Sequence, residues 1–190
     1  VGGAMQRLAV YCGSRSGHDS AFASAAEVLG ETLVRHGVGL VYGAAQIGLM
    51  GVVADTVLKL GGEVIGVMPR ALLEEEIVHP QLSQLELVDS MHQRKARMSE
   101  LADGMVALPG GFGTLEELFE ALTWLQLGLH EKPIGLMNVA GFFDPLLQFL
   151  DASVDKGFLS PQHRQLLRHH SDAELLLQDL LKQNRCDAPS

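Results

Sequence analysis

Cysteine is scarce in this sequence. Its 190 residues include only two cysteines, Cys12 and Cys186, near opposite ends of the chain. Two cysteines are too few for a disulfide-rich scaffold or a four-ligand zinc site. We therefore expect free thiols and a reducing compartment such as the cytoplasm, although a secreted chain trimmed of its signal would have the same composition.

Long apolar runs and a surplus of basic residues are also missing. No run approaches the roughly 20 apolar residues that a membrane helix needs. The 14 Lys and Arg residues face 23 Asp and Glu residues, a formal charge of −9. Such an acidic chain is a poor partner for nucleic acid or an anionic membrane, and we expect it to bind neither. The 47% apolar content excludes a disordered chain.

No linker divides the sequence, and we assign a single domain to residues 5–183. Residues 1–4 lack the basic and apolar segments of a signal peptide and are interpreted as a remnant of cloning. The tail at 184–190 has few groups to bury and is predicted to fray.

Apolar runs of strand length alternate with amphipathic stretches of helix length. Strands are predicted over residues 8–11, 39–42, 64–68, 85–88, 104–108 and 134–137. Helices are predicted over residues 22–33, 48–60, 91–102, 114–128, 142–156 and 172–182. The alternation predicts a single-domain, Rossmann-like, doubly wound parallel α/β sheet with helices on both faces.

Three predicted strands end in glycine-rich loops, at residues 11–17, 42–51 and 108–117. In such sheets ligands bind beyond the carboxyl ends of the strands, where the strand order reverses. Glycines let backbone amides approach a ligand, and a helix N-terminus attracts anions. One such loop could merely turn the chain, but three at one edge favour a phosphate site. The loops lack the Lys-Ser/Thr of a P-loop and the G-x-G-x-x-G pattern, which disfavours triphosphate hydrolysis and dinucleotide binding.

Glu117 has two interpretations. Thr114-Leu115-Glu116-Glu117 fits a capping box with Thr114 as N-cap, which alone would account for Thr114 and Glu117. Alternatively, Glu117 lies at a helix start beside the glycine loop, where the positive helix end favours an ionised carboxylate. Such a group suits a nucleophile or a stabiliser of positive charge better than a general acid.

A basic cluster lies in residues 91–98, where Arg94, Lys95 and Arg97 fall within four positions. Helical geometry places Arg94 and Arg97 on one face and points Lys95 elsewhere. Taken alone, the cluster favours a solvated helix surface. This helix, however, begins right after a predicted strand, at the ligand edge, where Arg94 could hold a phosphate with paired N–H bonds.

The adjacent histidines His169 and His170 are the most tempting metal ligands. Adjacent residues face different ways on a helix, and no third ligand follows at a suitable spacing. We therefore expect no metal site and no cofactor.

Several motifs together resemble the LONELY GUY (LOG) family. Residues 109–117 match its P-G-G-x-G-T-x-x-E motif, residues 91–95 match M-H-x-R-K, and residues 42–51 resemble Y-G-G-G-x-x-G-L-M-G. The likeness runs from Leu8 to about Leu159. Ala44 and Ala45 depart from the family's Gly-Gly, and a Cβ at each position narrows the approach to a ligand, which bears on affinity and on the base accepted.

The resemblance implies hydrolysis of the N-glycosidic bond in N6-substituted adenosine 5′-monophosphates, which are cytokinin nucleotides, and in AMP. The products are the free base and ribose 5-phosphate, and the protein is expected to be a homodimer. The alternatives are a non-catalytic module that binds a nucleoside monophosphate and a broad purine nucleotide 5′-monophosphate nucleosidase. Mislabelling as a lysine decarboxylase is common in this family, and no lysine here suggests a pyridoxal phosphate site.

The resemblance also implies site residues. Arg94 and Glu117 would be the catalytic pair. The nucleotide would be bound by these two and by Gly13, Ser14, Gly43, Glu76, Lys95, Gly110, Gly111, Phe112, Gly113, Thr114, Leu115, Glu116 and Thr123.

Overall fold

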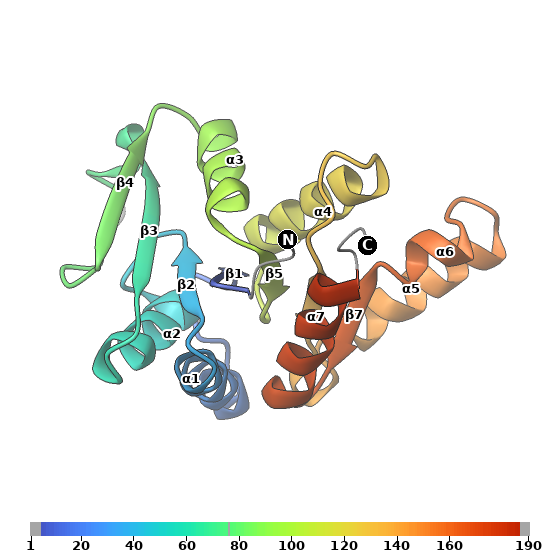
Figure 1. The fold of residues 1–190 in the computed structure, drawn as a ribbon, viewed down its shortest axis with the longest axis horizontal. Coiled ribbons are helices and arrows are strands. Elements are labelled where there is room, and N and C mark those ends of the chain that lie inside the picture. Colours follow the sequence, from blue (N-terminus) through green and yellow to red (C-terminus); the bar gives the residue numbers. More distant parts are fainter. Residues whose placement is uncertain (1–4, 76, 187–190) are drawn as a thin grey trace.

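The computed structural model describes residues 5–75 and 77–186, with side chains described as far as residue 182. Its centre is a seven-stranded sheet in the order β4-β3-β2-β1-β5-β6-β7, with all neighbouring strands parallel. The strands are β1 (Arg7–Tyr11), β2 (Gly39–Tyr42), β3 (Val64–Pro69), β4 (Gln84–Val88), β5 (Gly104–Ala107), β6 (Ile134–Met137) and β7 (Leu167–His170). This is the predicted doubly wound α/β fold (Figure 1).

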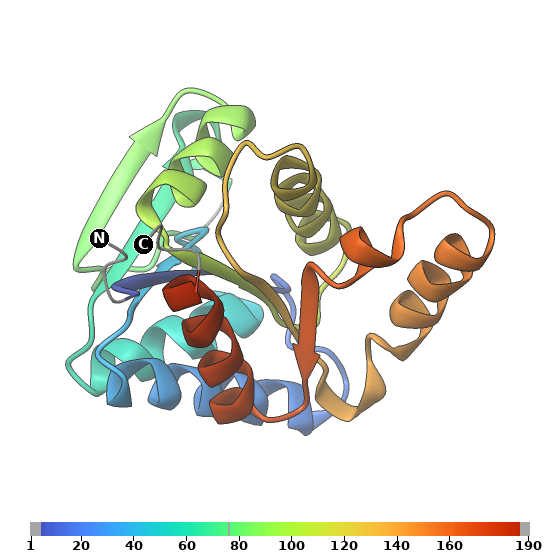
Figure 2. The same cartoon turned by 45° about the vertical axis from the view of Figure 1, so that its right-hand side comes forward.

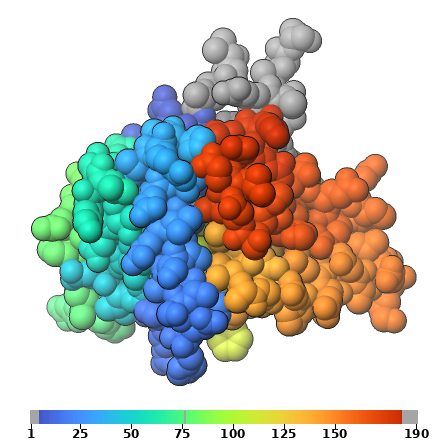
Figure 3. Space-filling model, turned by 90° about the horizontal axis from the view of Figure 1, so that it is seen from below, coloured from blue at the N-terminus to red at the C-terminus, as the bar shows by residue number. Residues whose placement is uncertain are grey.

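Helices cover both faces of the sheet. They are α1 (Ser20–Arg35), α2 (Gly48–Lys59), α3 (Met91–Leu101), α4 (Phe112–Gln126), α5 (Asp144–Asp155), the short α6 (Pro161–Arg164) and α7 (Ala173–Cys186). Buried side chains of α1, α2 and α7 form one apolar core with the sheet, and those of α3, α4 and α5 form another. Figure 3 shows α1, α2 and α7 side by side over the first face, and Figure 2 shows α5 and α6 extending away from the sheet.

The continuous apolar runs of the sequence became inner strands because both faces of those strands are covered. Every residue of β2, β3, β5 and β6 is buried, whereas the edge strand β4 is partly exposed. All six predicted strands and six predicted helices are present, with ends that differ by a few residues.

Two differences from the prediction lie near the C-terminus. The sequence does not predict β7, and treating His169 and His170 as helical was wrong, because they belong to this edge strand. An edge strand is buried only in part, so it lacks the apolar run that marks the inner strands. Residues 184–186 belong to α7, although the sequence predicts a frayed tail from residue 184. Residues 187–190 lie outside the described residues.

The strand order reverses between β1 and β5, which are adjacent in the sheet although β2, β3 and β4 lie between them in sequence. The loops that follow β1 and β5 therefore flank the same crevice, which is where such sheets bind ligands. Within residues 5–75 and 77–186, none of the helices combines the length and hydrophobicity needed to cross a bilayer.

Candidate functional site

The three glycine loops meet at the carboxyl edge of the sheet. The amide of Gly13, after β1, donates to the Pro109 carbonyl after β5 at 3.0 Å, and the Gly13 carbonyl accepts from the Leu49 amide of α2 at 3.1 Å. A Cβ on Gly110 would lie 2.0 Å from Thr114 Oγ1 and 2.9 Å from the Gly13 nitrogen. Only glycine fits between these loops at position 110, so the backbones form one compact cradle.

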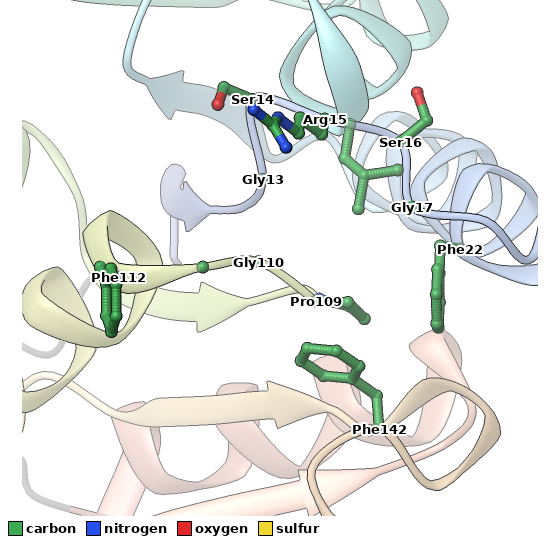
Figure 4. A pocket seen from close by; sticks show the side chains of 12 residues that line it. Gly13, Ser14, Arg15, Ser16, Gly17, Phe22, Pro109, Gly110, Phe112 and Phe142 are labelled. Atoms are coloured by element: carbon green, nitrogen blue, oxygen red, sulfur yellow. The ribbon is translucent and has the colours of Figure 1, made fainter.

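A cavity of about 570 Å³ opens beside this cradle (Figure 4). That volume is within the range of small-molecule sites, roughly 300–1,000 Å³. Gly13 and Ser14 line it from the β1 loop, and Gly110, Gly111 and Phe112 line it from the start of α4. These five residues are the part of the predicted site that shares the cavity.

Further residues line the cavity that the motifs do not assign to the site, some of them within the predicted glycine-rich loops. Arg15, Ser16 and Gly17 continue the β1 loop, and Leu49 comes from α2. Phe22 of α1 and Phe142, which follows β6, form an aromatic wall with ring centroids 5.7 Å apart. No motif marks these two phenylalanines as site residues. The sequence could indicate them only by their position, because Phe142 lies beyond the end of a strand and Phe22 lies in the first turn of a helix.

Helix α4 begins without a side-chain cap. Its N-cap is Gly111 and its first residue is Phe112, so Thr114 lies inside the first turn and the capping-box interpretation is wrong. Thr114 is buried, whereas Phe112 and Gly113 are exposed. An uncapped helix start leaves backbone N–H groups free for an anion, as a phosphate site requires. The Leu115 amide is bonded to Gly111, and its side chain packs on the apolar core.

Glu117 lies one turn further along α4 and is half-buried. Burial raises the pKa of its carboxyl group to about 7, the charges of Arg94 and Lys95 lower it, and those of Glu116 and Glu120 raise it further. The sequence favours an ionised carboxylate here, whereas at this pKa the group is only partly ionised at neutral pH. The local helix end favours the anion, but burial against the sheet outweighs that effect.

Arg94 is buried at the start of α3, under the ends of β2 and β3. Its Nη2 donates to the Gly43 carbonyl at 2.6 Å, and its Nε donates to the Val67 carbonyl at 3.1 Å. Its charge acts on Glu117 through space, and no ion pair joins the two within the described part of the chain. The structure thus brings Arg94, Gly43 and Glu117 to one region, and the solvated-surface interpretation is wrong for Arg94.

Lys95 is also buried, and it points toward α4. Its Nζ forms ion pairs with Glu116 and, at 2.9 Å, with Glu120. Burial alone lowers the pKa of Lys95, but the hydrogen bonds that Lys95 donates to these carboxylates outweigh that effect and raise its pKa above the ordinary value. Arg97, by contrast, is largely a surface residue paired with Glu86 and Glu100.

Thr123 is a predicted site residue that is not brought to the cradle. Thr123 lies near the C-terminal end of α4, where its Oγ1 donates to the Phe119 carbonyl at 2.7 Å. It lines a separate hollow of about 90 Å³ between α4 and the α5–β7 segment. Glu76 lies outside the described residues. Among those that are described, no group of three or more His, Cys, Asp or Glu side chains is arranged to hold a metal ion.

These features define a class: a doubly wound α/β protein with a glycine cradle at its switch point, a buried Arg94, and a half-buried Glu117 whose pKa is lowered by the Arg94 charge. A family model described as "Possible lysine decarboxylase" matches residues 50–180. The cytokinin riboside 5′-monophosphate phosphoribohydrolase LOG of Oryza sativa subsp. japonica is 48% identical over 162 residues, which is 85% of this chain and 67% of that protein. The cytokinin riboside 5′-monophosphate phosphoribohydrolase LOG7 of Arabidopsis thaliana is 46% identical over 175 residues, which is 92% of this chain and 81% of that protein.

Solved structures share the fold. The molybdenum cofactor carrier protein of Chlamydomonas reinhardtii superposes with a TM-score of 0.71 at 20% identity, covering 96% of this chain and 99% of that one. The molybdenum cofactor binding protein of Rippkaea orientalis gives a TM-score of 0.70 at 21% identity, covering 93% and 95%. The chain belongs to the LOG family, as its motifs predict.

Proposed function

We propose that this protein hydrolyses the N-glycosidic bond of N6-substituted adenosine 5′-monophosphates and of AMP, releasing the free base and ribose 5-phosphate. The observation that carries the proposal is the placement of Glu117 and Arg94 beside an uncapped helix N-terminus that can hold the 5′-phosphate. The names of the relatives, which are cytokinin riboside 5′-monophosphate phosphoribohydrolases, support the same reaction.

The glycine cradle is the proposed phosphate anchor. Phe112 and Gly113 are exposed residues in the first turn of α4, where the helix dipole favours an anion. Binding of this remote group would position the ribose and lower the barrier at the anomeric carbon.

Breaking the ribosyl C–N bond passes through an oxocarbenium-like state with positive charge on the sugar. The ionised form of Glu117 would stabilise that charge or activate the attacking water. With a pKa of about 7, a large fraction of Glu117 is ionised at neutral pH. The Arg94 N–H groups not used by Gly43 and Val67 would hold the phosphate or a sugar hydroxyl, and the Arg94 charge holds down the pKa of Glu117.

Amino-acid decarboxylation, suggested by the family description, does not fit these residues. A pyridoxal phosphate enzyme needs a lysine that can form a Schiff base. Lys95 is committed to Glu116 and Glu120, which keep it protonated. Lys132 has a pKa lowered by burial, but it precedes β6, at the opposite edge of the sheet from the cradle.

A substrate series tests the proposal. AMP, isopentenyladenosine monophosphate, GMP, CMP and adenosine would be incubated with the protein and the free base measured by chromatography. We expect the two adenine nucleotides to be cleaved and adenosine to be a poor substrate, because it lacks the anchored phosphate. Equal turnover of adenosine and AMP would refute the phosphate anchor, and equal turnover of GMP would identify a broad purine nucleosidase.

A non-catalytic binding module is the second candidate, because the structures with this fold include proteins named as cofactor carriers. Such a module would bind AMP without releasing adenine. Calorimetric binding of AMP with no base release would favour this candidate over the enzyme.

We also propose a cytoplasmic homodimer. The buried, free thiol of Cys12 suits a reducing compartment. Large apolar side chains are exposed near the ends of α4 and α5, beside the hollow that contains Thr123, and contiguous exposed apolar surface often marks an interface. They are Leu127, Leu129, Phe149 and Phe158.

A further inference from the structure

The turn that follows β2, residues 43–46, is held from outside by a segment distant in sequence. The Gln46 amide donates to the Ile77 carbonyl at 2.8 Å, and the His79 amide donates to the Ala44 carbonyl at 2.9 Å. These two bonds fasten the turn to the segment between β3 and β4.

The side chain of His79 extends this attachment to α2. It is only 1% exposed, and its Nδ1 accepts a hydrogen bond from the Gln81 amide at 3.1 Å. The proton of the neutral ring is thereby assigned to Nε2, which donates to Asp55 Oδ1 at 2.9 Å. Asp55 belongs to α2, the helix that begins directly after the turn. The segment that contains His79 therefore contacts both the turn and the helix that follows it.

The same turn supplies the acceptor of Arg94. The Gly43 carbonyl takes the Nη2 hydrogen bond, and a Cβ on Gly43 would lie only 2.1 Å from that nitrogen. The guanidinium therefore rests directly on the turn, and a displacement of the turn moves one of its two backbone anchors.

We propose that His79 and Asp55 are positioning residues that fix the turn under Arg94 and so set its placement relative to Glu117. The inference rests on the proposed glycosidic hydrolysis. Catalytic geometry is far more sensitive to small displacements than stability is, since a shift of about 1 Å can cost roughly 100-fold in rate. The Asp55 side chain is 63% exposed but His79 is buried, so removing the Asp55 carboxylate leaves a buried Nε2–H group without its acceptor, and a kinetic readout is needed beside a stability measurement.

Two substitutions at Asp55 separate positioning from folding. In Asp55→Ala the acceptor is lost, and we expect kcat for adenine release from AMP to fall roughly 10- to 100-fold, with a smaller change in KM because the glycine cradle itself is unaltered. In Asp55→Asn the Oδ1 acceptor is kept, and most of the activity should remain. Asp155→Ala, at an exposed carboxylate on α5, is the control and should match the wild type.

The pH profile gives a readout that a purely structural role would not move. Glu117 faces Arg94 and Lys95 from α3, Glu116 and Glu120 from its own helix, and Tyr11 and Cys12 from β1 and its loop. Because Arg94 lowers the pKa of Glu117, its displacement should shift the acid limb of the Asp55→Ala profile to higher pH.

A double-mutant test completes the experiment. In an Arg94→Gln background, Asp55→Ala should cause no further loss if it acts through Arg94. Additive losses of activity in the double variant would overturn this inference and leave the proposed function standing. The same holds if Asp55→Ala and Asp55→Asn lose equal activity and the pH profile does not move. Absence of base release by the wild-type protein would overturn the proposed function and this inference with it.

Discussion

Glu117 is a residue whose ionisation opposes folding. Its pKa is raised from 4.5 to about 7 in the folded protein. Between these values the folded state binds more protons than the unfolded state, so stability falls as pH rises through the window and stays lower above it. We expect Glu117→Gln to raise the free energy of unfolding by about 1–3 kcal/mol at pH 8 and to leave it unchanged at pH 4.

Urea unfolding of both proteins at the two pH values measures this difference. The same variant should lose base release from AMP by roughly 100-fold or more, since an acid–base or charge-stabilising group is removed. A gain in stability with a loss of turnover identifies a functional carboxylate. Equal stability of the two proteins at pH 8 would contradict the raised pKa.

The sequence predicts that Arg94 and Glu117 each lie just after a strand, and the structure brings the two to one region. The sequence does not predict how far each is buried or protonated. The capping box assigned to Thr114 and the ionised carboxylate assigned to Glu117 both rest on neighbours in sequence, whereas the pKa of Glu117 depends on its burial in the folded chain and on the charges of Arg94 and Lys95 from α3. Contacts between distant segments decide the protonation state.

Ala44 and Ala45 are both fully buried but differ in backbone conformation. Ala44 has a φ of +68°, where an L-residue is strained by roughly 1–2 kcal/mol, and Ala45 does not have a positive φ. We expect Ala44→Gly to raise the unfolding free energy by up to about 1 kcal/mol and Ala45→Gly to lower it by a similar amount. Chemical denaturation of both variants checks the opposite signs, and a loss of stability in Ala44→Gly would contradict the strain argument.

At the scale of elements, two glycines at the start of α4 are expected to have different roles, one in stability and one in phosphate binding. Gly113 lies in the first turn with nothing within 4 Å of an added Cβ, whereas a Cβ on Gly110 collides with Thr114. We expect Gly110→Ala to cost about 1–3 kcal/mol by overpacking. Gly113→Ala should add up to about 1 kcal/mol through helix propensity while raising the KM for AMP, since a methyl group would be added beside the proposed phosphate anchor.

Thermal unfolding and steady-state kinetics of both variants provide the test. An unchanged KM in a stabilised Gly113→Ala protein would remove Gly113 from the phosphate site. A stable Gly110→Ala protein would show that the loops can separate at little cost.

Helices and strands can be predicted where one local sequence pattern dominates. Inner strands have a continuous apolar run, and amphipathic helices have apolar residues three or four positions apart. The edge strand β7 has none, because Leu167 alone of its four residues is buried. The helix α4 begins at Phe112 rather than at 114, because the loop packing around Gly110 fixes where it starts, and capping preferences of Thr114 do not override that packing.

At the scale of the whole molecule, the sheet order brings the site together. Residues 13, 43, 94 and 110 are distant in sequence, and they meet because β1 lies between β2 and β5. The parallel alternation predicts this edge. It does not predict the aromatic wall of Phe22 and Phe142, since their contact depends on how α1 and the segment after β6 pack.

The proposed homodimer gives a prediction at this scale. Leu129 and Phe149 are 68% and 66% exposed on the side of the molecule formed by α4 and α5. Burying a large apolar side chain contributes about 1.5–3 kcal/mol, so replacing one with a charge should weaken an interface there strongly. We expect Leu129→Asp and Phe149→Asp to convert a dimer into a folded monomer, measured by size-exclusion chromatography with light scattering.

The control is Leu175→Asp on α7, which packs on the opposite face of the sheet and exposes 54% of this residue. It introduces the same charge and should leave the dimer intact. Dissociation of all three variants would indicate a general effect of added charge on a chain that already carries −9. A wild-type protein that is monomeric at micromolar concentration would refute the dimer.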